Sequence, residues 1–277
     1  DMRASVCVIG GGLTGLTTAY YLSKYTNVVL LERDRICSHT SGRNTGKVTS
    51  QHEVFYRYLI DSQGKEFAKK YLEANQKAIE NISEIVQNEK IDCDFKREKA
   101  YVFTAKETEV DKLKKEQRAV DKLEKDLCQY VNKIELPMEI AGAIEFRSQA
   151  KLHPVKYGYG LAKCIVNNNS RIFENSQVTD IKKSNGKYEI YVDKTGLLSF
   201  LNKAIDTPKN CIAVSHARRF GKSHAAGMID AYYSLGSDSS KLFEDTRIAS
   251  DPDYEKYRNK YNVIHLDISS FFDDYKD

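Results

Sequence analysis

The sequence has 277 residues, of which 41% are hydrophobic and 30% charged, a balance typical of a globular protein large enough for two domains. The net charge of +4 is small and spread along the chain, which argues against nucleic-acid binding, and the apolar runs are too short to span a membrane. The six cysteines form no C-x-x-C pair and the first apolar run is too short for a signal peptide, so we expect a cytoplasmic chain without disulfides or a bound metal.

The N-terminal stretch predicts a strand–turn–helix–strand unit that binds a dinucleotide. An apolar run, Val6–Ile9, leads into a G-x-G-x-x-G motif, and a second apolar run, Val28–Leu31, ends at Glu32. Glycines at these positions allow a tight turn, a close approach of the backbone to a pyrophosphate, and close packing of helix on strand. Glu32 would accept hydrogen bonds from ribose hydroxyls. The loop and helix start expected to hold the phosphates comprise Gly10, Gly11, Gly12, Leu13, Thr14 and Gly15. An ordinary buried βαβ unit with a glycine turn is the alternative.

The polar, glycine-containing stretch from Arg33 to Val48 predicts a loop that folds back over such a cofactor. Its T-S-G-R-N-T-G segment, together with the glycine motif, resembles the N-terminal half of the flavin-dependent amine and amino-acid oxidoreductases, the group of D-amino-acid oxidase, glycine oxidase and sarcosine oxidase. In that family the loop contacts the pyrophosphate, the ribityl chain and the ring of the flavin. The resemblance therefore implies FAD as the cofactor. By position, it assigns flavin contacts to Arg33, Thr40, Ser41, Asn44, Thr45 and Gly46.

The middle of the chain predicts two amphipathic helices and two strands. The strands are expected at Lys99–Thr104 and Gly142–Phe146. The first helix, Val54–Asn88, would present the apolar positions Phe67, Tyr71, Ala74, Ala78, Ile82 and Ile85. The second helix, Glu107–Val131, would present Val110, Leu113, Val120, Leu123 and Leu127.

A further helix is predicted over Leu152–Asn167, where His153-Pro154 is a suitable start. For His153, a lone histidine beside a proline, we expect a structural role rather than a catalytic one. Short strands follow at Ile172–Glu174, Gln177–Lys183 and Lys187–Val192, with Ser184-Asn185-Gly186 as a hairpin turn. This order also resembles the flavin family, in which the strand containing Val178 would meet the adenine through its backbone. The resemblance covers residues 4–192. Some related proteins carry a Rieske cluster, but Cys37-Ser38-His39 is followed by no C-x-x-H, so we expect none here.

The character of the sequence changes near Tyr191. Cys211–Ser215 reads as a strand, and the segment after it ends in Gly221-Lys222-Ser223 before a helix, the order of a P-loop that cradles phosphates. Lys222 would reach the β- and γ-phosphates of ATP and Ser223 would ligate magnesium, although His216 stands where the first glycine is usual.

The stretches Y-V-D-K-T-G-L-L, A-R-R-F-G-K-S, L-F-E-D and N-V-I-H-L-D together resemble the start of a bacterial predicted AAA-ATPase-like family over residues 190–272. Ile264–Asp267 looks like a Walker B strand, but that family places its acidic magnesium-site strand later. We therefore expect Asp267 to be a strand-end or capping residue.

These observations predict an α/β fold. A Rossmann-like FAD-binding domain with inserted helices and a small strand layer would occupy residues 1–192, and a partial P-loop-type segment residues 193–277. The favoured function is an FAD-dependent oxidoreductase that moves hydride from a small amine or amino-acid substrate to the flavin. The alternatives are an ATP-binding module centred on Lys222 and a non-catalytic remnant. No catalytic side chain is assigned.

Overall fold

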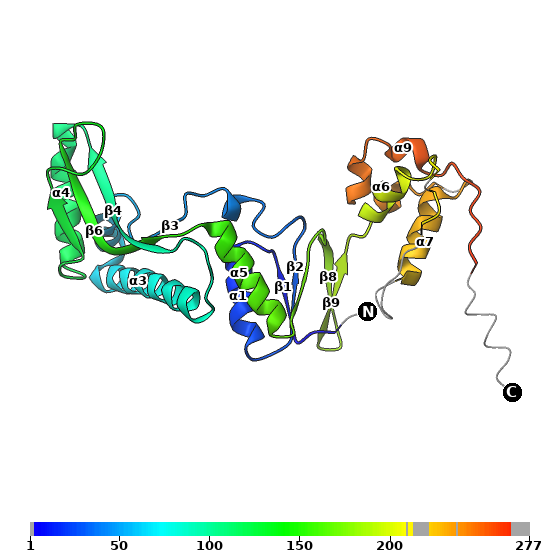
Figure 1. The fold of residues 1–277 in the computed structure, drawn as a ribbon, viewed down its shortest axis with the longest axis horizontal. Coiled ribbons are helices and arrows are strands. Elements are labelled where there is room, and N and C mark those ends of the chain that lie inside the picture. The colour runs from blue at the N-terminus through cyan, green and yellow to red at the C-terminus, as the bar shows by residue number, and fades with distance from the viewer. Residues whose placement is uncertain (1–2, 209, 213–221, 237, 267–277) are drawn as a thin grey trace. The chain divides into compact units, whose positions relative to one another are not determined.

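The computed structural model describes residues 3–208, 210–212, 222–236 and 238–266. The chain divides into two compact units. The first unit comprises Asp1–Gly10, Thr26–Arg35 and Arg171–Asp277, and the second comprises Gly11–Tyr25 and Ile36–Ser170. Figure 1 labels most of the helices and strands of both units.

A three-stranded parallel sheet forms the start of the first unit. Its strands are β1 (Val6–Ile9), β2 (Val28–Leu31) and β7 (Arg171–Phe173), in the order β1-β2-β7. Every residue of the central strand β2 is buried, as expected for an apolar strand with neighbours on both edges. Since helix α1 (Leu13–Ser23) joins β1 to β2 along the chain, the predicted βαβ unit is confirmed.

The strands β8 (Val178–Ser184) and β9 (Lys187–Val192) form an antiparallel hairpin in the same unit. Asn185 and Gly186 connect them with φ values of +50° and +74°. Positive φ at both central residues is typical of a type I′ turn, whose twist matches that of the strands. The predicted hairpin is therefore confirmed.

The described residues after 192 fold as short helices around a tyrosine-rich core. The helices are α6 (Gly196–Asn202), α7 (Lys222–Tyr233), α8 (Ser240–Phe243), the 3-10 turn η2 (Arg247–Ser250) and α9 (Tyr254–Tyr257). The core residues are Leu198, Tyr232, Tyr233, Phe243, Ile248 and Tyr257. The buried Asn202 amide satisfies two hydroxyls, donating to Tyr232 at 3.1 Å and accepting from Tyr233 at 2.7 Å. A polar link inside the core thus lets large tyrosines stay buried without unpaired hydroxyls.

Two strands predicted in this segment are not found among the described residues. Cys211 and Ile212 have irregular backbone, and residues 213–215 lie outside the described part. Residues 262–266 are also irregular, whereas Asp267 is outside it. Ile264 is largely exposed, and no strand within the described ranges pairs with it.

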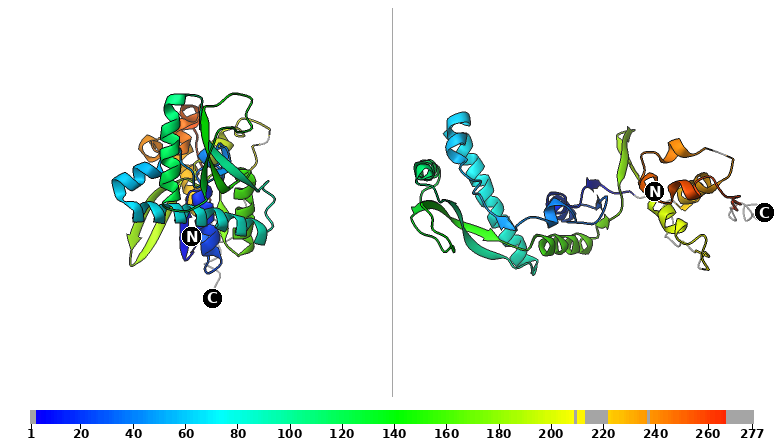
Figure 2. Two further views of the ribbon diagram at one scale, coloured as in Figure 1. Left: turned by 90° about the vertical axis from the view of Figure 1, so that its left-hand side faces the viewer. Right: turned by 90° about the horizontal axis from the view of Figure 1, so that it is seen from above.

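The second unit combines a helix pair with an antiparallel sheet. The helix pair is α1 and α5 (Pro154–Asn167), and the 3-10 turn η1 (Thr40–Gly42) lies against α5. The sheet runs in the order β3 (Lys47–Val48), β6 (Gly142–Lys151) and β4 (Lys96–Thr104), and β5 (Cys128–Val131) also pairs with β6. Helices α2 (Tyr56–Gln63), α3 (Lys65–Asn88) and α4 (Glu107–Asp121) complete the unit. Figure 2 shows these elements from two further directions.

The core of this sheet layer is continuous with the buried faces of the helices. Its central strand contributes Ile144 and Phe146, which are fully buried. The other members are Tyr56, Leu59, Ala68, Leu72, Ala100, Leu113, Val120, Leu123, Leu127 and Cys128. None of the helices in the described part of the chain is long and apolar enough to cross a membrane.

The predicted helix over Val54–Asn88 has the wrong boundaries, and most of the residues predicted for its apolar face are not the buried ones. Gly64, with a φ of +86°, ends α2 and separates it from α3. Phe67 is 51% exposed, because the face that packs inward lies about one position further round the helix. The buried residues of α3 are Ala68, Leu72, Ile79, Ser83 and Ile85, of which only Ile85 was predicted.

The predicted helix over Glu107–Val131 has the right apolar face but ends too late. Its five predicted apolar residues are all buried, but α4 ends at Asp121. Asp126, with a φ of +64°, turns the backbone, and Cys128–Val131 forms β5 against β6. Strand pairing with a distant segment therefore overrides the local helical pattern.

Candidate functional site

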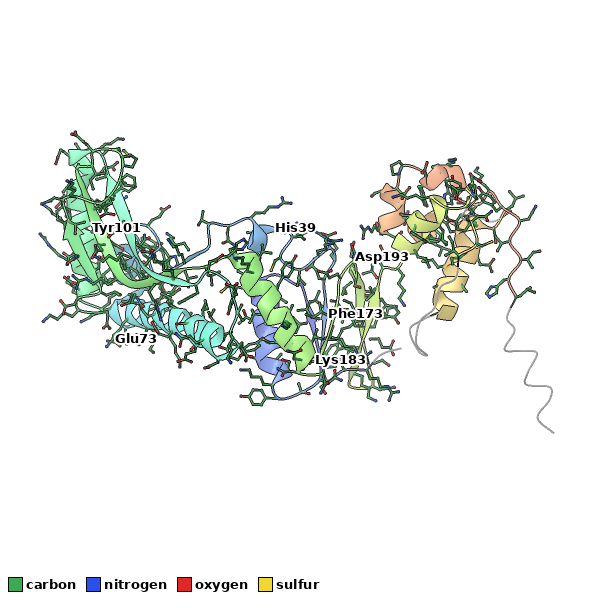
Figure 3. All side chains as sticks on the ribbon, in the orientation of Figure 1. His39, Glu73, Tyr101, Phe173, Lys183 and Asp193 are labelled. Carbon is green, nitrogen blue, oxygen red and sulfur yellow. The ribbon has the colours of Figure 1, made fainter. Side chains whose placement is uncertain are left out.

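Gly10 and Glu32 lie in the first unit, at the ends of β1 and β2. Gly10 has a φ of +103°, a conformation that favours glycine, and its N–H donates to the Leu31 carbonyl at 2.8 Å. Glu32 is 8% exposed, and its backbone is held by bonds to Phe173 and Ser176, each 2.8 Å long. Phe173 is labelled in Figure 3. The Glu32 carboxylate accepts the Asp34 N–H at 2.9 Å, so the predicted ribose-binding acid has a fixed position at the strand end.

The other residues of the glycine motif lie in the second unit, where α1 begins. Gly12 is the N-cap of α1, and the Leu13 N–H donates to the Ser41 hydroxyl oxygen at 3.0 Å. A Cβ added to Gly12 would lie 2.9 Å from that oxygen, so glycine leaves the space that Ser41 uses. The Cys37 N–H donates to the buried Gly11 carbonyl at 3.0 Å. The glycine loop and the following loop are thus joined at the N-terminus of one helix.

Thr14 and Gly15 form the first turn of that helix. The Thr14 carbonyl accepts the Thr18 hydroxyl at 2.9 Å, while Gly15 is half-buried. The first turn of α1 contains no acidic side chain, which leaves the positive end of the helix dipole uncompensated from within the helix.

Asn44 shapes the loop that was predicted to contact the flavin. Its amide donates to the Ser41 carbonyl and accepts the Gly46 N–H, both at 2.8 Å, and it also donates to the Thr40 carbonyl at 3.3 Å. Gly46 has a φ of +69°, and a side chain there would collide with the Leu152 carbonyl. The Leu152 N–H in turn donates to the Gly46 carbonyl at 3.0 Å, which fastens the loop beside the start of α5.

An open hollow of about 420 Å³ lies beside this loop, entirely within the second unit. It is lined by Gly42, Asn44, Thr45, Asp94, Lys151, Leu152, His153 and Pro154. His153 caps α5, because its Nδ1 accepts the Lys156 N–H at 3.4 Å. The backbone N–H of His153 donates to the Cys93 carbonyl at 2.7 Å. The capping contact gives His153 the structural role that was predicted for it.

Sequence reasoning missed three polar residues of this region. The Ser38 hydroxyl is buried and has no hydrogen-bond partner among the described residues. Asp94 and Lys151 both line the hollow, and Asp94 forms an ion pair of 2.8 Å with Lys156. Ser38 lies in the loop that was predicted to contact the flavin, so its position among the predicted residues could have identified it. Lys151 is the last residue of β6 and Asp94 lies just before β4, so the pairing of these two strands brings both residues near the loop, and local patterns do not reveal that pairing.

The remaining predicted residues lie in the first unit. Arg33 is exposed and its Nε donates to Asp34 at 3.1 Å. Val178 is half-buried in β8 and pairs with Val192. The described part of helix α7 runs from Lys222 to Tyr233. Gly221 lies outside the described residues, and the side chains of Lys222 and Ser223 are not described.

Two family models match the chain. Residues 5–207 match the model described as FAD dependent oxidoreductase, and residues 177–277 match one described as predicted AAA-ATPase. Both resemblances seen in the sequence are therefore confirmed, and the two matches overlap between residues 177 and 207.

Individual proteins agree with the first match. A Bacillus subtilis protein provisionally named as a Rieske 2Fe-2S iron–sulfur protein is 39% identical over 186 residues, which are 66% of this chain and 36% of that protein. Gamma-glutamylputrescine oxidoreductase of Escherichia coli is 28% identical over 188 residues, 66% of this chain and 44% of that protein. The chain thus spans less than half the length of either relative.

The fold is also similar to that of a solved structure. L-alpha-glycerophosphate oxidase from Mycoplasma pneumoniae, determined with FAD bound, has a TM-score of 0.53 at 20% identity. The match covers 70% of this chain and 50% of that one. At this identity the similarity concerns the fold alone.

Proposed function

The chain belongs to the family of FAD-dependent oxidoreductases, and we propose that it binds FAD and oxidises a small amine or amino acid. The observation that carries the proposal is the bond between the Leu13 N–H and the Ser41 hydroxyl, with Gly12 beside it. This contact brings the loop of residues 36–46 to the helix start where a pyrophosphate would bind.

Each part of FAD is assigned its own group of proposed contact residues. Phosphates would lie at Gly10, Gly11, Gly12, Leu13, Thr14 and Gly15, the ribose at Glu32, the adenine at Val178, and the flavin side at Arg33, Thr40, Ser41, Asn44, Thr45 and Gly46. Two features fit a bound polar group. Gly12 leaves room where any side chain would crowd Ser41, and the buried Ser38 hydroxyl would gain a partner that it otherwise lacks among the described residues.

Bound FAD would supply the acceptor for a hydride from the substrate. The chain's own residues would position the two reactants. Asn44 fixes the loop that would support the flavin, and the hollow beside Thr45 and Leu152 offers space for a small molecule. The name of the Escherichia coli relative, which refers to an amine-containing compound, supports an amine or amino acid as the substrate.

The test is the flavin content of the purified chain. We expect yellow protein that releases FAD on denaturation, and Gly12→Val should abolish this because the side chain occupies the phosphate and Ser41 space. Gly227→Val is the matched control, since an added Cβ at Gly227 meets nothing within 4 Å. Tight binding of NADH without flavin, or equal FAD in Gly12→Val and wild type, would refute the proposal.

A second candidate is ATP binding by residues 193–277, a segment that we propose to be distinct from the oxidoreductase part at 1–192. The observation that favours it is the match of residues 177–277 to the family model described as predicted AAA-ATPase. In the described part of the chain, Lys222 and Ser223 of the predicted Gly221-Lys222-Ser223 motif lie in helix α7. Ser223 would then ligate magnesium. Fluorescent ATP-analogue binding should weaken in Lys222→Ala. Equal binding by the variant and the wild type would remove this candidate.

A further inference from the structure

Three lysines lie side by side across the sheet of the second unit. Lys151 near the end of β6 is directly opposite Lys47 of β3 and also directly opposite Lys96 of β4. Directly opposite residues of antiparallel strands project from the same face of the sheet. These three residues, called the lysine row below, therefore place three ammonium groups on one face.

The lysine row carries more positive charge than its neighbours neutralise. Glu98 serves two of its members, with its Oε1 2.6 Å from the Lys96 Nζ and 3.2 Å from the Lys151 Nζ. Lys47 donates to the neutral Gln51 amide at 3.3 Å, and it has no carboxylate within ion-pair distance among the described residues. Hydrogen bonds from Lys96 and Lys151 hold the pKa of Glu98 below its usual value, so this carboxylate is charged at neutral pH.

Three positive groups against one negative group leave a surplus of two. Like charges placed directly opposite on a sheet destabilise the pairing. An anion bound among them would relieve this repulsion, so the arrangement favours an anionic ligand.

The position of the row connects it with the proposed cofactor site. Lys151 lines the same hollow as Asn44 and Thr45, which belong to the loop proposed to contact the flavin. Lys151, one of the three charged members of the row, therefore borders the space where a substrate would approach. All of these residues belong to the second unit.

We propose that the lysine row binds the carboxylate of the substrate, so that the substrate is an amino acid or another amine that carries a carboxylate. This inference rests on the proposed function, because it places substrate in the hollow beside the flavin loop. In this proposal Lys151 holds the substrate carboxylate in position, and Lys47 and Lys96 add to the positive charge around it.

The experiment is a ligand-observed NMR titration of the full chain at low salt, with benzoate as the probe and benzamide as its neutral analogue. Benzoate should bind and benzamide should not. Lys151→Gln should raise the benzoate Kd about threefold, as expected for an exposed charge pair. Glu98→Gln should change the Kd in the opposite direction, because it removes the negative charge that competes with the ligand.

Lys69→Gln is the matched control, since it makes the same charge change on α3, where Lys69 pairs with Glu73. It should leave the benzoate Kd unchanged. Equal Kd values in wild type, Lys151→Gln and Glu98→Gln would overturn the proposal, as would equal binding of benzamide.

FAD content, measured in the same preparations, separates this inference from the proposed function. Loss of FAD in Lys151→Gln would mean that the row holds a cofactor phosphate, which would overturn the carboxylate assignment. Wild-type protein that binds benzoate through the row but contains no FAD would refute the proposed function and support the row as a carboxylate site.

Discussion

Glu116 provides a sharp test of how the second unit is held together. Its side chain comes from α4 and is fully buried, yet it contacts the N-terminus of α2. The carboxylate accepts three backbone N–H groups, from Phe55 at 2.8 Å, Tyr56 at 2.6 Å and Arg57 at 2.9 Å. One acid therefore satisfies donors that the helix itself leaves unpaired, and it complements the positive end of the helix dipole.

The cost of removing this acid follows from the contacts it makes. A hydrogen bond to a charged group contributes about 1.5–3 kcal/mol, and loss of an N-cap costs about 0.5–2 kcal/mol. Because the three bonds share one carboxylate they do not add fully, and we expect Glu116→Ala to lower the free energy of unfolding by about 3–4 kcal/mol. Glu116→Gln keeps one acceptor oxygen and should cost about 1–2 kcal/mol.

Urea denaturation followed by far-UV circular dichroism measures these changes, since the chain has no tryptophan for fluorescence. With a slope of about 2 kcal/mol/M, the Glu116→Ala midpoint should fall by about 1.5–2 M. Asp111→Asn on the same helix is the control, because Asp111 is exposed and forms a surface ion pair with Lys115. A Glu116→Ala midpoint equal to that of the control would refute the reasoning.

Three further predictions concern the cofactor, acid stability and thiol reactivity. Glu32→Ala should reduce FAD bound per chain without abolishing it, since the phosphate contacts remain, and complete loss would contradict the assigned ribose role. The hydrogen bond from Tyr20 lowers the pKa of Glu89 below its ordinary value of 4.5. The resulting stability is present above pH 4.5 and lost as the pH falls through the lowered pKa, so Glu89→Gln should flatten the loss of unfolding free energy measured between pH 5 and pH 3. Burial raises the pKa of Cys128 to about 12, whereas Cys211 is exposed, so peptide mass spectrometry after iodoacetamide at pH 8 should find Cys211 modified first and Cys128 last.

Local chemistry explains which elements could be predicted from the sequence. The strands Val6–Ile9 and Val28–Leu31 were placed correctly because glycines and charged residues bound two short apolar runs. Asn185 and Gly186 tolerate positive φ, so the β8–β9 hairpin was also readable. In each case the deciding interaction lies within a few residues of the element.

Distant partners explain the errors. The apolar pattern of α3 suggested an inward-facing Phe67, yet the neighbouring face, which contains Leu72 and Ile79, is the one that is buried. Cys128–Val131 is compatible with a helix until β6 supplies a strand to pair with. Periodicity records which positions are apolar, but the partner decides which apolar face is buried.

The same distinction between local and distant partners separates the polar residues of the candidate site that were predicted from those that were not. Ser41 and Asn44 were found because they stand in the same short loop, although the bond from Leu13 to Ser41 spans 28 positions. Lys151 was not, because the residues beside it in the sheet, Lys47 and Lys96, lie on the distant strands β3 and β4. Its meaning appears only when β4 is placed beside β6.

Register is the property that a single sequence does not carry for these strands. Lys47, Lys96 and Lys151 are ordinary surface lysines when they are considered one at a time. A shift of one residue in the β3–β6 or β4–β6 pairing would turn one lysine to the opposite face and disperse the positive charge. The buried side chains Ile144 and Phe146 fix the middle of β6 in the hydrophobic core, and an irregularity between Glu98 and Ala100 shifts the register to the one that pairs Lys96 with Lys151. The alignment of the strands thus determines which lysines lie together on one face of the sheet. A substitution in the hydrophobic core that shifts this alignment should therefore alter anion binding, even though all three lysines are retained.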